Sequence, residues 1–319
     1  MGSNNSPKKT VVILWDQAGQ LANELWNYMS VFAYCLEKGY ELKNYAFYKY
    51  GRFFNIPVGN QLVDYLYFKT FPFYQSLFPG RLGRHLSDLL YRYGFAQPVK
   101  RIKKSRIING TECVKYLPPT RKSEPMLRHL EQDSSRVIYF YGGLFRNPVG
   151  LEKYRQGILH YFQYPKSART KVQEFITSLR SRYRHLVGVH IRQTDYRVYR
   201  GGRYYVTPQE TAVFARQYLK YFKRSQTETC FIICSDGAVD LQCFGDLNVV
   251  RSHGNPIEDL LVLASSDVIL GSNSTYGGLA SWYGNIPLIV MLKKGIDWNY
   301  YKDKNEFFQN KYYLGVCTL

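Results

Sequence analysis

The amino-acid sequence predicts an α/β fold whose second half is a parallel, doubly wound sheet, and three observations carry this prediction. Residues 186–191 (LVGVHI) form a short apolar run with β-branched residues, as found in strands covered on both faces of a parallel sheet. Short apolar runs alternate with segments of helical period through this half. Polar residues follow several of these runs, and ligands of open α/β sheets bind beyond the carboxyl ends of the strands.

The length and composition indicate a globular protein with two domains. The chain has 319 residues, of which 45% are hydrophobic and 21% are charged. No stretch approaches the roughly 18 consecutive apolar residues of a membrane span. The apolar run 11–15 is shorter than the core of a signal peptide, which has about 7 residues or more. We therefore expect a soluble, cytoplasmic protein in which residues 1–6 (MGSNNS) are a flexible leader.

The six cysteines form no metal-binding or disulfide pattern. None belongs to a C-x-x-C pair or has a neighbouring histidine that would suggest zinc. We expect them to be reduced thiols, as in cytoplasmic proteins. They are Cys35, Cys113, Cys230, Cys234, Cys243 and Cys317.

The formal net charge of +19 predicts an acidic partner without identifying it. The excess is larger in the first half of the chain, and its densest run is 100–106 (KRIKKSR). We expect reversible peripheral contact with the anionic inner face of a membrane through this run, Arg81 and Arg84. The alternative is that the charge only keeps the protein soluble.

The first half of the chain contains one clear unit of strand, turn and helix. We expect a strand at 10–15, a turn at 16–19 and a helix at 20–36, where apolar residues recur at helical spacing. Prolines and aromatic residues interrupt any period between 40 and 136, so we expect short helices and long loops there, with one helix inside 74–93. Further on, we expect a strand at 136–141, helices at 152–162 and 165–180, and a domain boundary near residue 165.

The second half continues the alternation of strands and helices. Besides residues 186–191, the expected strands are 229–234, 249–250, 268–270 and 286–291. The expected helices are 208–221, 257–264 and one that opens after residue 275 and runs through residue 282. Thr207 is the expected N-cap of the first of these helices, because its hydroxyl can accept from the free N–H groups of the first turn.

A polar triplet at the end of the central strand is the first candidate site. His190, Arg192 and Asp195 lie within six positions of one another. An arginine at this place can bind a phosphate through two parallel hydrogen bonds. The alternative is a structural salt bridge between Arg192 and Asp195.

Two helix starts are further candidates. The loop 16–24 (DQAGQLANE) places Gly19, Gln20 and Asn23 at the start of its helix, and residues 271–275 (GSNST) place hydroxyls ahead of another. A helix start offers free N–H groups and a partial positive charge, which suit a phosphate or a sugar hydroxyl without a metal. The alternative for the first loop is an ordinary capped turn.

Three segments together resemble the signatures of GDP-fucose-dependent fucosyltransferases. They are GQLANELWNY at 19–28, HIRQTDY at 190–196 and SNSTYGGLASWYG at 272–284. Their order is that of the family, especially of its α1,2 members and their α1,6 and protein O-fucosyl relatives. The resemblance implies a GT-B fold, with two Rossmann-like domains whose parallel sheets face a central cleft. It implies an acceptor-side domain at 1–164 and a GDP-sugar-binding domain at 165–319.

The resemblance also implies roles for individual residues. His190 would contact the guanine or ribose side of the donor, and Arg192 would hold the β-phosphate and stabilise the departing GDP. Asp259 would read the guanine edge. The residues expected to hold further phosphate oxygens are Ser272, Asn273, Ser274 and Thr275. The residues expected to line the same cleft are Ser235 and Asp236, with Gly19, Gln20 and Asn23 facing the fucose and the acceptor.

Three departures from the family pattern are visible. Gln193 stands where the family has the second arginine of His-x-Arg-Arg, and Ala22 stands where it has a glycine. Gly277 and Gly278 stand where an aromatic pair is expected after SNST. The last two changes affect the acceptor side, so they bear on the acceptor and the linkage more than on the donor.

These observations predict an inverting glycosyltransferase that transfers fucose from GDP-fucose to a hydroxyl of a glycan acceptor, forming an α1,2 linkage. The acceptor is expected to be an oligosaccharide or a lipid-linked glycan. Asp195 is the first candidate for the base and Glu210 the second, since a carboxylate near the acceptor hydroxyl is required. No metal or other cofactor is expected, because no Asp-x-Asp pair lies beside a predicted strand.

Two alternatives remain open at this point. One is the transfer of another GDP-activated sugar, such as mannose or rhamnose. The other is a basic nucleic-acid-binding protein, favoured only by the charge and by the tyrosines and arginines interleaved at 91–93 and 196–205. We expect no nucleic-acid partner.

Overall fold

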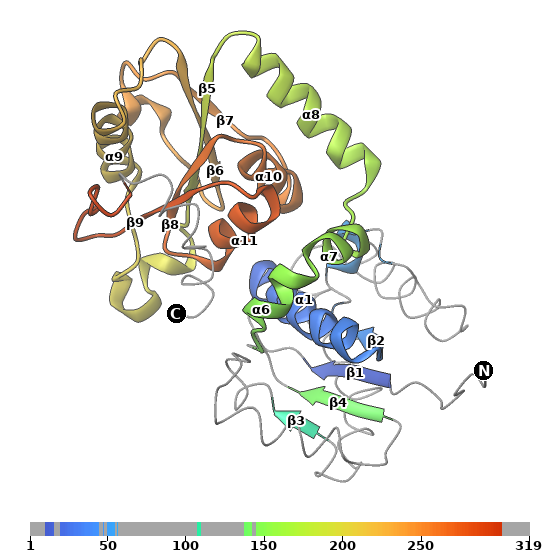
Figure 1. Ribbon diagram of the computed structural model, residues 1–319. Helices are drawn as coiled ribbons and strands as arrows, with labels where there is room; N and C mark the ends of the chain where they lie inside the picture. Colours follow the sequence, from blue (N-terminus) through green and yellow to red (C-terminus); the bar gives the residue numbers. More distant parts are fainter. Residues whose placement is uncertain are drawn as a thin grey trace, which may run out of the picture. The chain divides into compact units, whose positions relative to one another are not determined.

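The computed structural model describes residues 10–15, 20–44, 47, 50–54, 56, 107–109, 137–141 and 145–301. The chain divides into two compact units, Met1–Tyr164 and Pro165–Leu319, and each is described here by itself. Both units combine helices with a parallel β-sheet, so the predicted fold class is confirmed (Figure 1).

The first unit contains a four-stranded parallel sheet in the order β2-β1-β4-β3. Its strands are β1 (Thr10–Trp15), β2 (Glu41–Asn44), β3 (Ile107–Asn109) and β4 (Val137–Tyr141). Strands β1 and β4 confirm the prediction. The region 40–136 was expected to hold only helices and loops, and β2 and β3 correct this, since strands of four and three residues are too short to show a period. The predicted turn at 16–19 and helix inside 74–93 lie outside the described residues.

The helices of the first unit follow local capping rules. They are α1 (Leu21–Lys38), α6 (Pro148–Lys153) and α7 (Arg155–Tyr161), with a short 3₁₀ helix η2 (Gly51–Phe53). The structure has two helices, α6 and α7, where the sequence predicts a single helix at 152–162. The first starts early because Asn147 caps it, its Oδ1 accepting from the Gly150 N–H at 2.9 Å, and Pro148 suits the first helical position.

Aromatic contacts join α1 to the end of α7. The ring of Tyr28 lies edge-on to Phe162 at 4.8 Å, and its hydroxyl lies 3.1 Å from the hydroxyl of Tyr161. Phe32 stacks on Tyr161 at 4.2 Å. Tyr28 and Phe162 are buried in the core of the unit, and the partly buried rings of Phe32 and Tyr161 pack against them.

The second unit contains a five-stranded parallel sheet in the order β7-β6-β5-β8-β9. Its strands are β5 (His185–Ile191), β6 (Thr229–Ser235), β7 (Val249–Arg251), β8 (Val268–Ser272) and β9 (Leu288–Met291). Its helices are α8 (Lys166–Arg180), α9 (Pro208–Tyr221), α10 (Pro256–Ala264) and α11 (Thr275–Gly284), with 3₁₀ helices η5 (Asp195–Arg197), η6 (Tyr199–Gly202) and η7 (Leu241–Phe244). Every predicted strand and helix of this half is present, within three residues at each end.

The central strand β5 is buried on both faces, as its sequence predicts. Val187, Val189 and Ile191 belong to the core that α9 covers. On the other face, the backbone of Gly188 comes so close to the end of α10 that an added Cβ would lie 2.9 Å from Leu263 Cδ2 in the helix and 2.8 Å from the Ser266 hydroxyl just beyond it. From β5 the chain proceeds to β6 and β7 on one side and then crosses to β8 and β9 on the other (Figure 1). The point at which the strand order reverses, called the switch point, therefore lies between β5 and β8. Ligands of open α/β sheets bind at the switch point.

We predict that Gly284→Ala destabilises the second unit by about 1–3 kcal/mol, the usual range for overpacking. A Cβ at Gly284, the last residue of α11, would collide with the carbonyl oxygen of Ala264 at the end of α10. The measurement is urea unfolding followed by circular dichroism. Gly157→Ala in α7 is the matched control, because its Cβ would meet only Leu36 Cδ1 at an ordinary 3.7 Å. Equal effects of the two changes would contradict the close packing of α10 and α11.

Candidate functional site

The carboxyl ends of β5 and β8 are tied together at the switch point by one hydroxyl. The backbone N–H of Arg192 donates to Ser272 Oγ at 3.0 Å, and this hydroxyl donates to the His190 carbonyl at 3.2 Å. Ser272 is fully buried and is the last residue of β8, two residues beyond the predicted end of that strand. Its hydroxyl therefore positions Arg192 and is not free on the surface to meet a phosphate.

The guanidinium of Arg192 lies between two carboxylates. Its Nη1 is 2.8 Å from Asp236 Oδ2, and its Nη2 is 2.6 Å from Asp195 Oδ1. The salt bridge to Asp195, which the sequence left open as an alternative, is present. The second pair joins Arg192 to Asp236, which comes from the end of β6. One positive and two negative charges leave this cluster with a formal charge of −1.

The two carboxylates are held very differently. Asp236 accepts the Gln193 N–H at 2.7 Å and the Thr194 hydroxyl at 2.5 Å, and its side chain is 25% exposed. Burial by itself raises the pKa of Asp236, but the hydrogen bonds from Thr194 and Gln193 and the charge of Arg192 outweigh it and lower the pKa. Asp195 is 50% exposed and has, apart from Arg192, a long contact of 3.4 Å with the Thr194 hydroxyl. Asp195 can therefore leave Arg192 more easily than Asp236 can.

Gln193 has a structural role that sequence reasoning missed. It is buried, and its Nε2 donates to Ser235 Oγ at 3.1 Å and to the Ala238 carbonyl at 2.7 Å. Ser235 in turn donates to the Ile191 carbonyl at 2.8 Å. Gln193 and Ser235 thus fasten the turn after β6, which carries Asp236, to the end of β5. An arginine at position 193 would place a charge in this buried place, which is costly without a paired anion.

His190 lies beside the start of α11 as a neutral imidazole. Burial, and next the charge of Arg192, lower its pKa to about 4, although Asp236 acts in the opposite direction. Its ring centroid is 4.9 Å from that of Tyr276. Its Nδ1 is buried without a hydrogen-bond partner in the part of the chain that the structure describes. A neutral ring with an unpaired nitrogen suits a hydrogen bond to a base or a ribose hydroxyl.

The turn between β8 and α11 brings the remaining candidates of the last motif together. Ser274 caps α11, its Oγ accepting from the Tyr276 N–H at 3.3 Å, and Thr275 is the first residue of the helix. The carbonyl of Asn273 accepts from the hydroxyl of Tyr196 at 2.9 Å. Tyr196 was not among the predicted site residues, and it connects this turn to the segment that follows Arg192.

Asp259 lies in α10, near the end of β6. The thiol of Cys234 in β6 is 3.8 Å from its carbonyl oxygen, and its Oδ1 accepts from the Ser252 hydroxyl at 2.5 Å. Burial raises the pKa of Asp259 to about 6, against the lowering effect of the Ser252 hydrogen bond. A partly buried carboxylate with such a pKa is typical of a functional site.

The three N-terminal candidates belong to the first unit. Gly19 lies outside the described residues, and Gln20 is exposed at the N-cap of α1 without a capping hydrogen bond. Asn23 Oδ1 accepts from Nη2 of Arg146 at 3.4 Å. Arg146 is a buried charge that sequence reasoning missed, and its Nη1 donates to the Phe145 carbonyl at 3.0 Å. It stays a prediction that these residues line one cleft together with those of the second unit.

Glu210 is engaged elsewhere. Its carboxylate accepts the Thr207 N–H at 2.7 Å, while its own N–H donates to the Thr207 hydroxyl at 3.1 Å. This capping box confirms Thr207 as the cap of α9. Because the carboxylate is used in the cap, we withdraw Glu210 as a candidate base.

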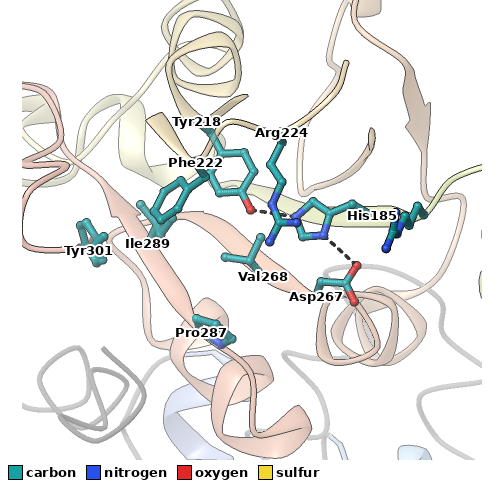
Figure 2. Close-up of a pocket in the computed structure, with 10 residues that line it drawn as sticks. His185, Tyr218, Phe222, Arg224, Asp267, Val268, Pro287, Ile289 and Tyr301 are labelled. Atoms are coloured by element: carbon teal, nitrogen blue, oxygen red, sulfur yellow. Dashed lines mark hydrogen bonds and ion pairs between the residues drawn. The ribbon is translucent and has the colours of Figure 1, made fainter. Parts of the chain in front are cut away.

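A cavity of about 260 Å³ lies at the opposite edge of the sheet, near the amino ends of β5 and β8. Figure 2 shows His185 between Tyr218 and Asp267, with Nε2 2.8 Å from the tyrosine hydroxyl and Nδ1 3.2 Å from Asp267 Oδ2. Arg180 adds two hydrogen bonds of 2.7 Å to the same carboxylate. These polar groups pair with one another, so they fasten α8 and α9 to the start of β5 rather than offer free ligand contacts.

The described residues hold no group of three or more His, Cys, Asp or Glu placed for a metal ion. Within the same residues, no helix is both long enough and apolar enough to span a bilayer. Cys35, Cys230, Cys234 and Cys243 are free thiols, while Cys113 and Cys317 lie outside the described residues, as do residues 100–106, Arg81 and Arg84.

The fold is similar to that of solved fucosyltransferases. A solved structure of a FUT1 mutant from Arabidopsis thaliana in complex with GDP aligns with a TM-score of 0.53 at 11% identity, over 90% of this chain and 71% of that chain. Two structures of the fucosyltransferase NodZ from Bradyrhizobium align at 14% identity, with TM-scores of 0.51 and 0.50. They cover 92% and 89% of this chain and 97% and 96% of the NodZ chains.

No protein-family model and no curated protein matches the sequence. At these identities the likeness shows the fold, and the predicted GT-B architecture of Rossmann-like units is thereby confirmed.

Proposed function

We propose that the protein is an inverting fucosyltransferase that transfers fucose from GDP-fucose to a hydroxyl of a glycan acceptor, forming an α1,2 linkage. The observation that carries this proposal is Arg192 at the β5–β8 switch point, beside the N-terminus of α11. Both can bind a diphosphate. The FUT1 structure of the same fold was solved in complex with GDP, which supports a GDP-sugar donor. The linkage rests on the sequence resemblance alone.

In the proposed reaction, the bond between fucose C1 and the β-phosphate oxygen breaks while the acceptor oxygen attacks C1 from the opposite face. Negative charge grows on the leaving GDP, where Arg192 and the positive end of the α11 helix dipole stabilise it. The acceptor proton passes to the carboxylate of Asp195. The products are GDP and the fucosylated glycan, so no redox partner is needed. Because the protein supplies the positive charge, we propose that transfer is metal-independent. A requirement for magnesium after EDTA treatment would contradict this.

The ion pairs of Arg192 suggest an order of events. A diphosphate competes with the carboxylates for the guanidinium, and Asp195 is the more exposed and less fastened of the two. We infer that the donor takes the place of Asp195 on Nη2, while Asp236 keeps the guanidinium aimed. The released carboxylate of Asp195 is then available for the acceptor proton.

The first experiment is a thermal-shift panel with GDP, GDP-fucose, GDP-mannose and GDP-rhamnose. A ligand that binds only the folded protein raises its melting temperature. We expect GDP and GDP-fucose to stabilise the protein. Selective stabilisation by another GDP-sugar would replace fucose in the proposal, and no shift with any of them would overturn it. We further propose that residues 1–164 contribute to acceptor binding and that the enzyme works in the cytoplasm.

We predict that Arg192→Ala lowers the transfer rate about 100- to 1000-fold, the usual effect of losing one preorganised charge-stabilising group. The measurement is GDP release with GDP-fucose as donor, with circular dichroism to verify folding. Arg182→Ala is the control, since Arg182 is exposed and lies over the Tyr183 ring. A purely structural ion pair would instead give lost stability with retained turnover.

We predict opposite effects of the two carboxylates on GDP affinity. Asp195→Asn removes the competitor of the diphosphate, so GDP should bind several-fold more tightly, while transfer falls by about 100-fold or more for lack of the base. Asp236→Asn loosens Arg192, so GDP should bind more weakly. Isothermal titration calorimetry measures both. Equal weakening in the two variants would rule out the displacement of Asp195.

We predict that GDP affinity falls as the pH drops below about 6, the pKa of Asp259. Both oxygens of the ionised carboxylate can accept hydrogen bonds from N–H groups of the guanine edge, whereas the protonated form has only one such oxygen. Below the pKa, the GDP affinity should therefore fall by a factor that approaches tenfold per pH unit. Asp259→Asn should bind GDP weakly at pH 8 and flatten the profile. Burial raises this pKa above its unfolded value, so the contribution of Asp259 to stability is present at low pH and is lost as pH rises through 6. A loss of folding stability through Asp259 therefore cannot cause the fall in GDP affinity at low pH. If the GDP affinity of Asp259→Asn still depended steeply on pH, Asp259 would not be the residue that binds the guanine edge.

A further inference from the structure

We propose that residues 195–205 form an acceptor-binding surface of the second unit and that the acceptor is a glycan with an anionic group. This inference rests on the proposed function and adds to it the chemical class of the second substrate. The segment comprises η5, η6 and the residues that follow them, and its sequence is DYRVYRGGRYY. We refer to Tyr196, Tyr199 and Tyr204 as the tyrosine platform.

The three rings of the tyrosine platform lie against one another at the surface. The centroids of Tyr196 and Tyr199 are 5.8 Å apart with nearly parallel planes, and Tyr204 is 6.3 Å and 6.2 Å from them. Tyr199 is 46% exposed, and its neighbour Val198 is 79% exposed. Tyrosine offers an apolar face with a polar tip, which suits a partner that is partly apolar and partly hydrated, such as a sugar ring.

The tyrosine platform is connected directly to the donor side of the sheet. The Tyr196 hydroxyl donates to the Asn273 carbonyl in the turn before α11, and the Arg192 guanidinium lies 5.6 Å from the Tyr196 ring centroid. Asp195, the proposed base, precedes Tyr196 in the chain. A sugar bound on this surface would therefore lie at the same edge of the sheet as the proposed donor phosphates. An acceptor has to lie close to the donor in this way for transfer to occur.

Two arginines on the tyrosine platform point to an anion. Arg200 lies over the Tyr199 ring at 5.6 Å and Arg203 over the Tyr204 ring at 4.9 Å. Neither has a carboxylate partner among the residues that the structure describes. Arg200 also has φ of 48°, a conformation that residues other than glycine rarely adopt. Arg200 shares part of its guanidinium edge with the hydroxyls of Tyr204 and Tyr199. Carboxylate or phosphate oxygens match the N–H edge that a stacked guanidinium presents.

A neutral sugar would use the rings but would leave both arginines without an anionic partner. A glycan with a carboxylate or a phosphate close to the stacked ring uses both features. Single-stranded nucleic acid would also use aromatic rings and arginines. We favour the glycan because the tyrosine platform is joined to Asn273 and Arg192, so its ligand would lie beside the reacting groups.

The test compares anionic probes with neutral ones of the same chain length. Tetragalacturonate is paired with its methyl ester, and chitotetraose 1-phosphate with chitotetraose, so that the carboxylate and phosphate sources are distinguished. A single-stranded DNA 12-mer is the nucleic-acid probe. Binding is measured by calorimetry in 50 mM and 200 mM salt, with GDP saturating.

We expect at least one anionic glycan to bind about tenfold more tightly than its neutral counterpart. Arg200→Gln with Arg203→Gln should abolish that preference, and Tyr199→Ala should weaken both members of the pair. The matched control is Lys166→Gln with Arg169→Gln, which removes the same charge from exposed positions of α8 and should keep the preference. The GDP-induced thermal shift should stay the same in all these variants.

No preference for either anionic glycan, or an equal loss in the α8 control, would overturn the inference. DNA binding that is tighter than glycan binding and is lost with Arg200 and Arg203 would replace the glycan with nucleic acid. The native protein's response to GDP separates these results from the proposed function. If GDP gives no thermal shift, the transferase proposal fails, and the glycan preference still decides what the tyrosine platform binds.

Discussion

The position of the Arg192 guanidinium between Asp236 and Asp195 is the constraint on which the rest of the site depends. A cation at the end of a buried strand must be paired, because burial of an unpaired charge is costly. The pair with Asp236 in turn requires that β6 ends in register with β5. Ser235, Gln193 and Thr194 all contribute hydrogen bonds that keep this register at the carboxyl edge.

The same arrangement reconciles a basic protein with a site that is locally acidic. The net charge of +19 attracts anions from a distance, whereas the cluster at Arg192 carries a formal charge of −1. In the proposed function, long-range attraction would bring a nucleotide diphosphate to the sheet edge, and only a ligand whose geometry lets it replace a carboxylate on Arg192 would stay there. Electrostatics of this kind gives selectivity for a bidentate anion over simple anions.

The opposite edge of the same sheet shows what a purely structural polar cluster looks like in this protein. His185, Asp267 and Tyr218 satisfy one another, and Arg180 completes the network (Figure 2). At the carboxyl edge, by contrast, His190 Nδ1 has no partner among the described residues, and Asp195 is half exposed. The two edges differ in the unpaired His190 nitrogen and in the exposure of the Asp195 carboxylate, and this difference is the physical basis for placing the chemistry beyond the carboxyl ends of the strands.

The sequence by itself determined the alternation of strands and helices in the second unit, the cap at Thr207 and the polar triplet after β5. These features depend on local spacing and on side-chain chemistry within one or two turns. Only the tertiary structure decided that Asp236 shares Arg192 with Asp195, that Gln193 is buried and that Glu210 belongs to a cap. Strands β2 and β3 were likewise decided by pairing with β1 and β4, since four and three residues carry too little pattern of their own. Contacts between distant segments depend on the register of neighbouring strands, and no local period encodes that register.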